Sequence, residues 1–268
     1  SVMGLILKDG INLDLIKTAL LAFLSIGILL FLINYLPFLK AIFPNYSFQF
    51  GGLIGNTSFV GIPIASALIN SGYLPNDAIN LSVGFDLGTT LFAWIFGPIF
   101  LQDTINKYEL LNAKGLLKAL LSSPASKGII GVLFAYLFGL EKDLGTLLTV
   151  PTTIVLSLAI LVVGSRLGII TNNKNKIIEF NDHIKSSIIL KLIIFPLVIF
   201  FVGKLLNFSS YQVTATVIQA GTPTAISTIL MAEAYKINQS IASTILFTTT
   251  LFSILTIPFL TFLLSLPK

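Results

Sequence analysis

The sequence predicts an all-α protein whose helices cross a membrane, and three observations support this. Of the 268 residues, 55% are hydrophobic and only 10% are charged, whereas soluble domains average about 25% charged residues. The mean hydropathy is +0.95. Apolar segments recur along the whole chain, each with the roughly 20 residues that a helix needs to cross a hydrocarbon core ~30 Å thick.

Eight such segments follow one another with polar connections between them. They are residues 12–36, 47–71, 77–101, 117–140, 145–169, 184–206, 211–235 and 240–266. We expect three parts: a first repeat at residues 1–101, a cytoplasmic loop at 102–116 and a second, five-helix repeat at 117–268.

Composition also excludes several classes of protein. The chain has no cysteine and a single histidine, so thiol-ligated metal sites and His-based catalysis are not expected. Basic residues are scattered and form no basic-aromatic patch, which argues against nucleic-acid binding. An intramembrane aspartyl protease would need two facing carboxylates, and only Asp86 lies deep in a predicted span. We therefore expect no enzyme, no metal and no cofactor.

Two of the eight spans are interrupted by residues that disfavour helix. Gly51, Gly52, Gly55, Gly61 and Pro63 are expected to break the second span, and Gly221 and Pro223 the seventh. Paired interruptions of this kind indicate the binding site of a secondary transporter. The alternative is that these residues only kink two helices for close packing. The candidate binding residues are those at the two breaks: Gly55, Asn56, Thr57, Gly221, Thr222, Pro223 and Thr224.

The order of the spans predicts an inverted repeat. Residues 14–101 and 184–266 each contain a plain span, a broken span and a third span rich in Thr, and the two triplets would cross the membrane in opposite directions. Two further spans precede the second triplet and none precede the first, so we expect two N-terminal helices beyond this sequence. Lys and Arg are about twice as frequent on one side, which would be cytoplasmic, so both ends of the chain are expected outside.

Two charged residues are predicted deep in the membrane, Asp86 in the third span and Lys191 in the sixth. A charge at that depth costs roughly 2.5–3.5 kcal/mol on insertion scales and needs a reason to be there. One explanation is a proton or sodium coupling site. The other is a structural ion pair between these two side chains.

Several motifs together resemble the auxin efflux carrier family, and the resemblance covers essentially the whole chain. They are Gly55–Pro63, Asp86–Thr90, Gly97–Pro98, Ser123–Pro124, Gly221–Ala225, Ala232–Glu233 and Ser253–Pro258. The resemblance implies helices three to ten of a ten-helix inverted-repeat fold, in which two broken helices cross. It also implies that Asn56 and its neighbours contact a small organic anion such as malate or malonate. Sodium-coupled bile-acid symporters are distantly similar, which keeps sodium open at Asp86.

The sequence thus predicts a multi-pass protein of the cell membrane that transports a small mono- or dicarboxylate, or an auxin-like acid. The alternatives are a receptor of the same fold that transports nothing and a sodium-coupled symporter of a larger organic anion. The expected partners are the carboxylate and the lipid bilayer, and a homodimer is one assembly to consider.

Overall fold

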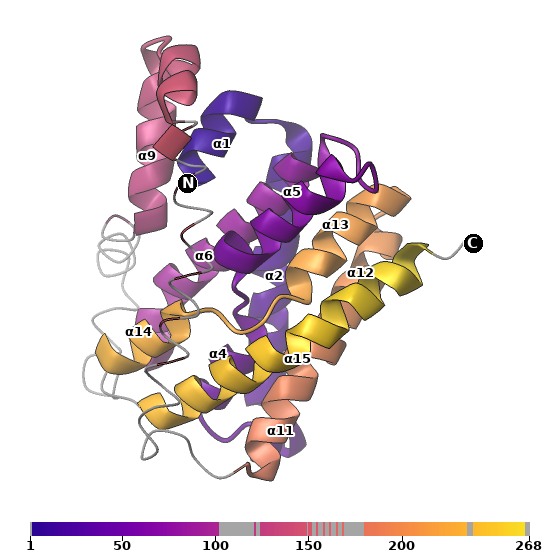
Figure 1. Cartoon of the computed structure of the whole chain (residues 1–268). Helices are drawn as coiled ribbons and strands as arrows, with labels where there is room; N and C mark the ends of the chain where they lie inside the picture. The colour runs from indigo at the N-terminus through magenta and orange to yellow at the C-terminus, as the bar shows by residue number, and fades with distance from the viewer. Residues whose placement is uncertain are drawn as a thin grey trace.

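The protein is all-α over the part that the computed structural model describes (Figure 1). Those residues are 2–101, 121, 124–148, 150–151, 180–234 and 238–265, with single positions at 154, 158, 161, 165 and 168. The expected loop 102–116 and most of the expected span 145–169 lie outside the described residues. The division of the chain into three parts therefore remains a prediction.

The first long helix, α2 (Leu13–Tyr35), coincides with the first predicted span. The side chain of Asn12 accepts a hydrogen bond from the backbone N–H of Leu15 at 2.8 Å, which caps the N-terminus of the helix. Two short helices flank it, α1 (Val2–Asp9) and α3 (Pro37–Ile42), and neither was predicted. Pro37 stands at the start of α3, where its missing N–H is tolerated.

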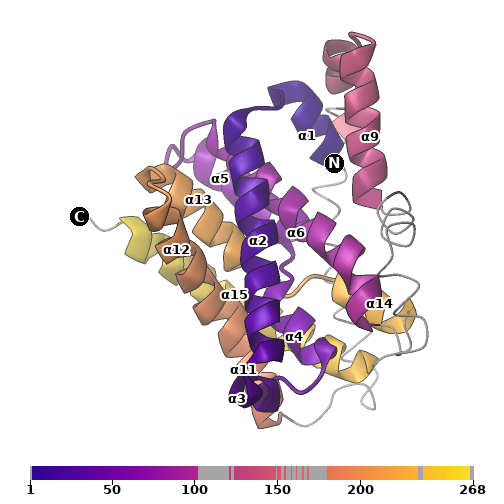
Figure 2. The same ribbon diagram turned by 180° about the vertical axis from the view of Figure 1, so that it is seen from behind.

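Helix α6 (Ala78–Leu101) coincides with the third predicted span and lies alongside α2 (Figure 2). Two glycines of α6 allow this close approach. A Cβ on Gly84 would collide with the carbonyl oxygen of Leu15, and one on Gly88 with that of Ala19. Small residues at a contact between membrane helices let the two backbones pack directly.

The first broken span consists of α4 (Tyr46–Leu53), a π-helical turn η1 (Thr57–Gly61) and α5 (Ile62–Asn70). The second consists of α13 (Ser210–Ala220) and α14 (Ser227–Ala234). In both spans the chain leaves the helix for several residues and then resumes it. Both expected interruptions are therefore present in the structure.

The remaining spans agree with the predicted segments where they are described. Helix α9 (Pro124–Leu137) lies within residues 117–140. The sixth span is α11 (Asp182–Ile189), a π-helical turn η3 (Leu190–Ile194) and α12 (Phe195–Leu205). The last is α15 (Gln239–Ser265), which passes diagonally in front of the others in Figure 1.

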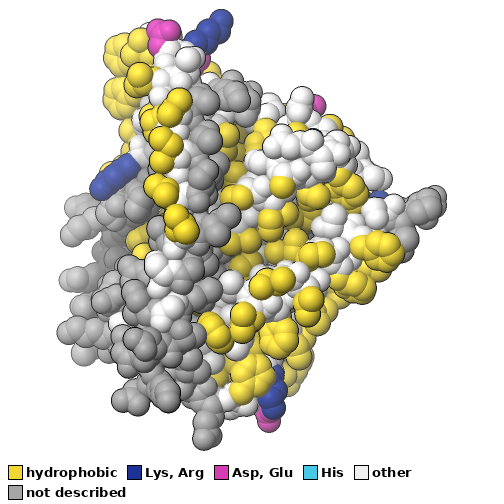
Figure 3. Space-filling view, viewed as in Figure 1, with side chains coloured by type: hydrophobic (Ala, Val, Ile, Leu, Met, Phe, Trp, Pro, Cys, Tyr) yellow, Lys and Arg dark blue, Asp and Glu magenta, His cyan; other side chains and the backbone are white. Residues whose placement is uncertain are grey.

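Among the described residues, four helical segments are long and apolar enough to cross a membrane: Leu13–Tyr35, Ala78–Gly97, Asp182–Leu205 and Gln239–Ser265. Large hydrophobic side chains point outward from them, among them Phe31, Phe201 and Phe259. Figure 3 shows many hydrophobic side chains over the described part of the face seen in Figure 1, with the visible charged side chains near its edges. A surface of this kind is suited to lipid and not to water. The prediction of an all-α membrane protein is confirmed.

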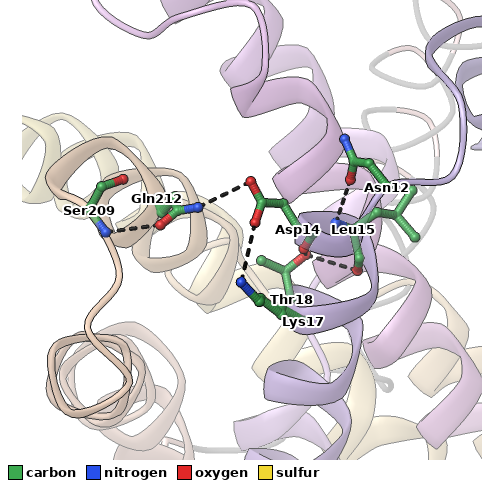
Figure 4. Close-up of polar contacts among 7 residues, drawn as sticks. All are labelled: Asn12, Asp14, Leu15, Lys17, Thr18, Ser209 and Gln212. Atoms are coloured by element: carbon green, nitrogen blue, oxygen red, sulfur yellow. Dashed lines mark hydrogen bonds and ion pairs between the residues drawn. The ribbon is translucent and has the colours of Figure 1, made fainter.

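A polar link joins the start of α2 to the start of α13 at one end of these helices (Figure 4). The carboxylate of Asp14 accepts a hydrogen bond from Nε2 of Gln212 at 3.2 Å and lies 3.9 Å from Nζ of Lys17. The Oε1 atom of Gln212 accepts the backbone N–H of Ser209 at 2.9 Å. One side chain thus caps α13 and ties it to α2.

Candidate functional site

The two broken spans meet where each is unwound, and this meeting point of residues 54–56 with residues 221–226 is the crossing. Residues Ile54–Asn56 follow α4, and residues Gly221–Ile226 separate α13 from α14. The two extended segments run antiparallel and form an isolated β-bridge between Gly55 and Thr224. The N–H of Asn56 donates to the carbonyl of Pro223 at 2.7 Å, and the N–H of Ala225 donates to the carbonyl of Ile54 at 3.0 Å. The two breaks thereby satisfy each other's backbone groups, which buried non-helical chain requires.

Thr224 fastens this crossing to the helices around it. Its hydroxyl donates to the carbonyl of Gly51 in α4 at 2.6 Å, and its backbone N–H donates to Oγ1 of Thr249 in α15 at 3.1 Å. The side chain is fully buried. Of the predicted binding residues, Thr224 is therefore occupied in holding the crossing together.

Asn56 lies at the point where the first broken span resumes its helix. Its carbonyl accepts the N–H groups of Val60 and Gly61, so it precedes η1 as the N-cap residue, but its side chain makes no capping bond. The residue is 4% exposed. A buried carboxamide beside a helix N-terminus offers donors to an anion.

Asp86 in α6 faces the same turn from the other side. One of its carboxylate oxygens, Oδ1, accepts hydrogen bonds from the hydroxyls of Thr57 and Ser58, the latter at 2.6 Å. Both hydroxyls belong to η1, directly after Asn56. Thr57 thus connects the predicted coupling residue to the predicted binding residue, which the sequence did not indicate.

Lys191 in η3 approaches the crossing from a different direction. Its Nζ donates to the carbonyl of Ala220, the last residue of α13, at 2.6 Å and lies 4.9 Å from the ring centroid of Phe195. A Cβ added to Gly55 would lie 3.0 Å from Nζ of Lys191 and 2.6 Å from Oγ1 of Thr222. Only glycine therefore fits at position 55 without displacing one of these groups.

The structure contradicts the ion-pair explanation of the two deep charges. Within the described part of the chain, the ion pairs are Lys17–Asp14 and Lys185–Asp182, both near the surface. Asp86 is held by two hydroxyls and Lys191 by a carbonyl. The residues are fully or almost fully buried, but they do not neutralise one another by direct contact.

Of the five residues expected to break the second span, Gly55 lies in the unwound stretch, whereas Gly61 and Pro63 do not interrupt the helix. The chain unwinds earlier, at Ile54–Asn56, and continues as helix through Pro63. Proline lacks an N–H and its ring clashes with the carbonyl four residues before it. Here the N–H of Ile62 bonds to the carbonyl of Thr57, five residues back, so a widened π-turn accommodates the proline.

A second π-turn, η3, precedes Pro196 in the same way. The N–H of Phe195 bonds to the carbonyl of Leu190, again five residues back. The two π-turns carry Thr57 and Ser58 in one case and Lys191 in the other. Turns of this type are frequent at functional sites, and here they bear the side chains that reach the crossing.

Gln219 is a residue of the crossing that the sequence reasoning missed. It is fully buried near the end of α13, and neither Oε1 nor Nε2 has a hydrogen-bond partner among the described residues. A Cβ on Gly61 would collide with its Oε1, so the carboxamide packs against η1. A glutamine two residues before Gly221 in an apolar segment was the available signal.

A hollow of about 860 Å³ opens beside the crossing, between α5 and α15. It is lined mainly by apolar side chains, including Phe59, Pro63 and Ile257, and Pro223 is the predicted binding residue on its wall. Asn56, Thr222 and Lys191 do not line it. The hollow therefore reaches the crossing at Pro223 and does not extend to Asn56, Thr222 or Lys191.

Among the described residues, no group of three or more His, Cys, Asp or Glu side chains is placed to hold a metal ion. The polar groups that gather at the crossing are hydroxyls, carboxamides, one carboxylate and one ammonium. Such a set can bind a small anion and a proton.

The family described as membrane transport protein matches residues 147–261. A comparison with curated proteins gave no match. The matched region contains Lys191, Gln219 and the second broken span, and the match agrees with the resemblance noted from the sequence motifs. Residues 147–261 are therefore similar to the membrane transport protein family, which is consistent with the resemblance to the auxin efflux carriers.

Proposed function

We propose that this membrane transporter is a secondary carrier for a small organic anion and works by alternating access around the crossing. The substrate would be a mono- or dicarboxylate such as malate or malonate, or an auxin-like acid. The observation that carries the proposal is the backbone bridge between Gly55 and Thr224. It joins two unwound segments inside a membrane protein, where irregular backbone is tolerated only if it is buried in protein or lines a cavity.

The crossing offers an anion the groups that it needs. The helical segment Thr57–Asn70 begins there, and so does α14. A helix N-terminus carries roughly half a positive elementary charge and unpaired N–H groups. The Asn56 side chain would donate to the carboxylate, with Gly55, Thr57, Gly221, Thr222 and Pro223 forming the surrounding wall.

Access to this site would alternate between the two sides of the membrane. The hollow between α5 and α15 reaches Pro223, whose carbonyl holds the N–H of Asn56. A rigid-body movement of one repeat against the other would open the crossing first to one side and then to the other. We also propose that the chain contains an inverted repeat, that both chain ends lie outside the cell and that the protein forms a homodimer.

A receptor of the same fold is the second candidate, and a sodium-coupled symporter of a larger anion is the third. The large apolar hollow favours the symporter of a larger anion, because it would admit a bulky acid. The charge-bearing groups at the crossing, Asp86 and Lys191, favour a small carboxylate over a bulky acid as the ligand.

Flux measurements in proteoliposomes test the proposal. Labelled malate, malonate and indole-3-acetate are offered with and without a proton or a sodium gradient. We expect saturable flux of at least one acid, with a lower affinity for that acid in Asn56→Ala. Binding of an acid without flux would identify the receptor, and absence of both binding and flux would contradict the proposal.

A further inference from the structure

We propose that the coupling ion is a proton carried by Asp86, and that the Thr57 hydroxyl links its uptake to binding of the anion. This rests on the proposed function, because it concerns the same crossing. It specifies the ion, the residue that senses the ion and the group that transmits the change.

The first argument is the distribution of charge at the crossing. Lys191 lies at the C-terminal end of α13, bonded to Ala220, and next to Gly55, two residues beyond the end of α4. Each helix C-terminus carries roughly half a negative charge. The single positive charge of Lys191 therefore offsets two helix ends of opposite sign.

Asp86 has the complementary position. It accepts the hydroxyls of Thr57 and Ser58 at the N-terminus of the segment Thr57–Asn70. The other N-terminus of the crossing, that of α14, adds roughly half a positive charge more. With Asp86 ionised, the helix ends and the two side chains nearly cancel. The crossing then has little attraction for a further anion.

Protonation of Asp86 removes one negative charge, so the crossing gains a net positive charge that can attract one substrate carboxylate. A substrate carboxylate that enters as the proton enters restores the balance. One proton and one carboxylate are thus taken up together, and both are released together on the other side of the membrane. No bond is formed or broken except that between the proton and the Asp86 carboxylate.

Thr57 supplies the mechanical connection. Its hydroxyl has one proton to donate, and in this structure it donates that proton to Asp86. A protonated carboxyl is a weaker acceptor, so the hydroxyl becomes free to turn toward a carboxylate beside Asn56, the adjacent residue. The same hydroxyl proton would then serve Asp86 in the empty carrier and the substrate in the loaded one.

Few other charges can compete for this role. Helices α2, α5, α13, α1, α9 and α14 and the turn η1 pack against α6. Neither η1 nor α5 nor α13 contains a charged residue. The charged or titratable side chains on all these elements, besides Lys191 on η3, are Lys8, Asp9, Asp14, Lys17, Tyr35, Lys127, Tyr136, Tyr211 and Glu233. Within the described residues, the hydrogen bonds to Asp86 come from Thr57 and Ser58 alone.

Equilibrium binding of labelled malate, malonate and indole-3-acetate to the purified full chain tests the proposal. The range is about pH 6 to 8, where carboxylates of the probes are mostly ionised. We expect the wild-type affinity to fall with rising pH, approaching tenfold per unit for one linked proton. Asp86→Asn should bind as tightly at the alkaline end as the wild type does at the acidic end, without a pH dependence. Asp182→Asn is the matched control, an exposed carboxylate that should leave the wild-type profile unchanged.

Thr57 is tested by a pair of variants. Thr57→Ser keeps the hydroxyl and should keep both affinity and pH dependence, whereas Thr57→Val should lose about tenfold or more of the affinity. A measurement on the wild type alone guards against variants that fail to fold. In weakly buffered solution, a pH indicator should report about one proton taken up per anion bound.

The outcomes separate the two proposals. Binding or flux that is independent of pH, a pH slope that persists in Asp86→Asn, or an affinity that rises with sodium at constant pH would overturn the proton assignment and leave the carrier intact. Unchanged affinity in Thr57→Val would remove the hydroxyl link. Absence of binding to every acid at every pH would overturn both proposals together.

Discussion

Lys191 and Ala220 are joined by a hydrogen bond of 2.6 Å from the ammonium to the carbonyl that ends α13. The ammonium is fully buried and has no carboxylate partner among the described residues. A buried cation without an anion is costly, and here helix C-termini take the place of the anion. This arrangement makes Lys191 part of the electrostatic balance of the crossing.

We therefore expect Lys191→Gln to weaken anion binding about tenfold or more at every pH. Lys191→Arg should bind nearly as well as the wild type, because it keeps the charge. Lys204→Gln is the matched control, since Lys204 is a half-buried lysine of the same span, 6.0 Å from the ring centroid of Phe200. Equal anion affinities in all three variants would show that Lys191 only stabilises the end of α13 and does not contribute to anion binding.

Asn56→Ala should weaken the binding of the transported anion by about 1–3 kcal/mol, the cost of leaving a buried polar partner unsatisfied. Thr222→Val should cost less, because its hydroxyl donates to the carbonyl of Gln219 within its own span at 2.7 Å. Binding of the labelled acid to the purified variants measures both. Normal expression with unchanged affinity in Asn56→Ala would exclude this side chain from the site.

Gly55→Ala should impair both stability and transport. The new Cβ would lie 2.6 Å from Oγ1 of Thr222 and 3.0 Å from Nζ of Lys191, and such overpacking typically costs about 1–3 kcal/mol. Gly128→Ala in α9 is the control, because no atom lies within 4 Å of its added Cβ. A melting temperature as high in Gly55→Ala as in Gly128→Ala would contradict the close approach at the crossing.

Gln212→Ala should destabilise the protein by about 0.5–2 kcal/mol, the range typical of a lost helix cap. It removes the acceptor for the Ser209 N–H and the link to Asp14. The anion affinity should stay the same, because these contacts are at the end of the helices. Lys17→Ala breaks only an exposed 3.9 Å ion pair and should change stability by less than about 1 kcal/mol. Thermal unfolding in detergent distinguishes the two.

The predicted orientation is tested with single cysteines, since the chain has none of its own. Asp182→Cys and Ser210→Cys place exposed thiols on either side of the span Asp182–Leu205. An impermeant maleimide added to intact cells should label position 210 and not position 182. The reverse pattern would invert the assignment made from the Lys and Arg distribution.

Local sequence determined the membrane class, most of the span positions and the existence of the two breaks. Span length follows from the thickness of the bilayer, and α2, α6 and α15 lie within one residue of the predicted segments at both ends. The interruptions were visible because Gly and Pro are rare inside ordinary helices. Gly55 and Thr224, which form the bridge at the crossing, were among the candidates named from the sequence, and their roles as binding residues stay a prediction.

Tertiary structure decided which groups meet. Whether Pro63 breaks a helix depends on the turn before it, and the π-turn at Thr57–Gly61 absorbs the proline instead. The partners of Asp86 and Lys191 depend on how their helices pack at the crossing. The two charges suggested an ion pair, but Asp86 accepts two hydroxyls and Lys191 donates to a backbone carbonyl. Periodicity and composition describe each helix by itself, whereas contacts between residues distant along the chain arise only when the helices pack.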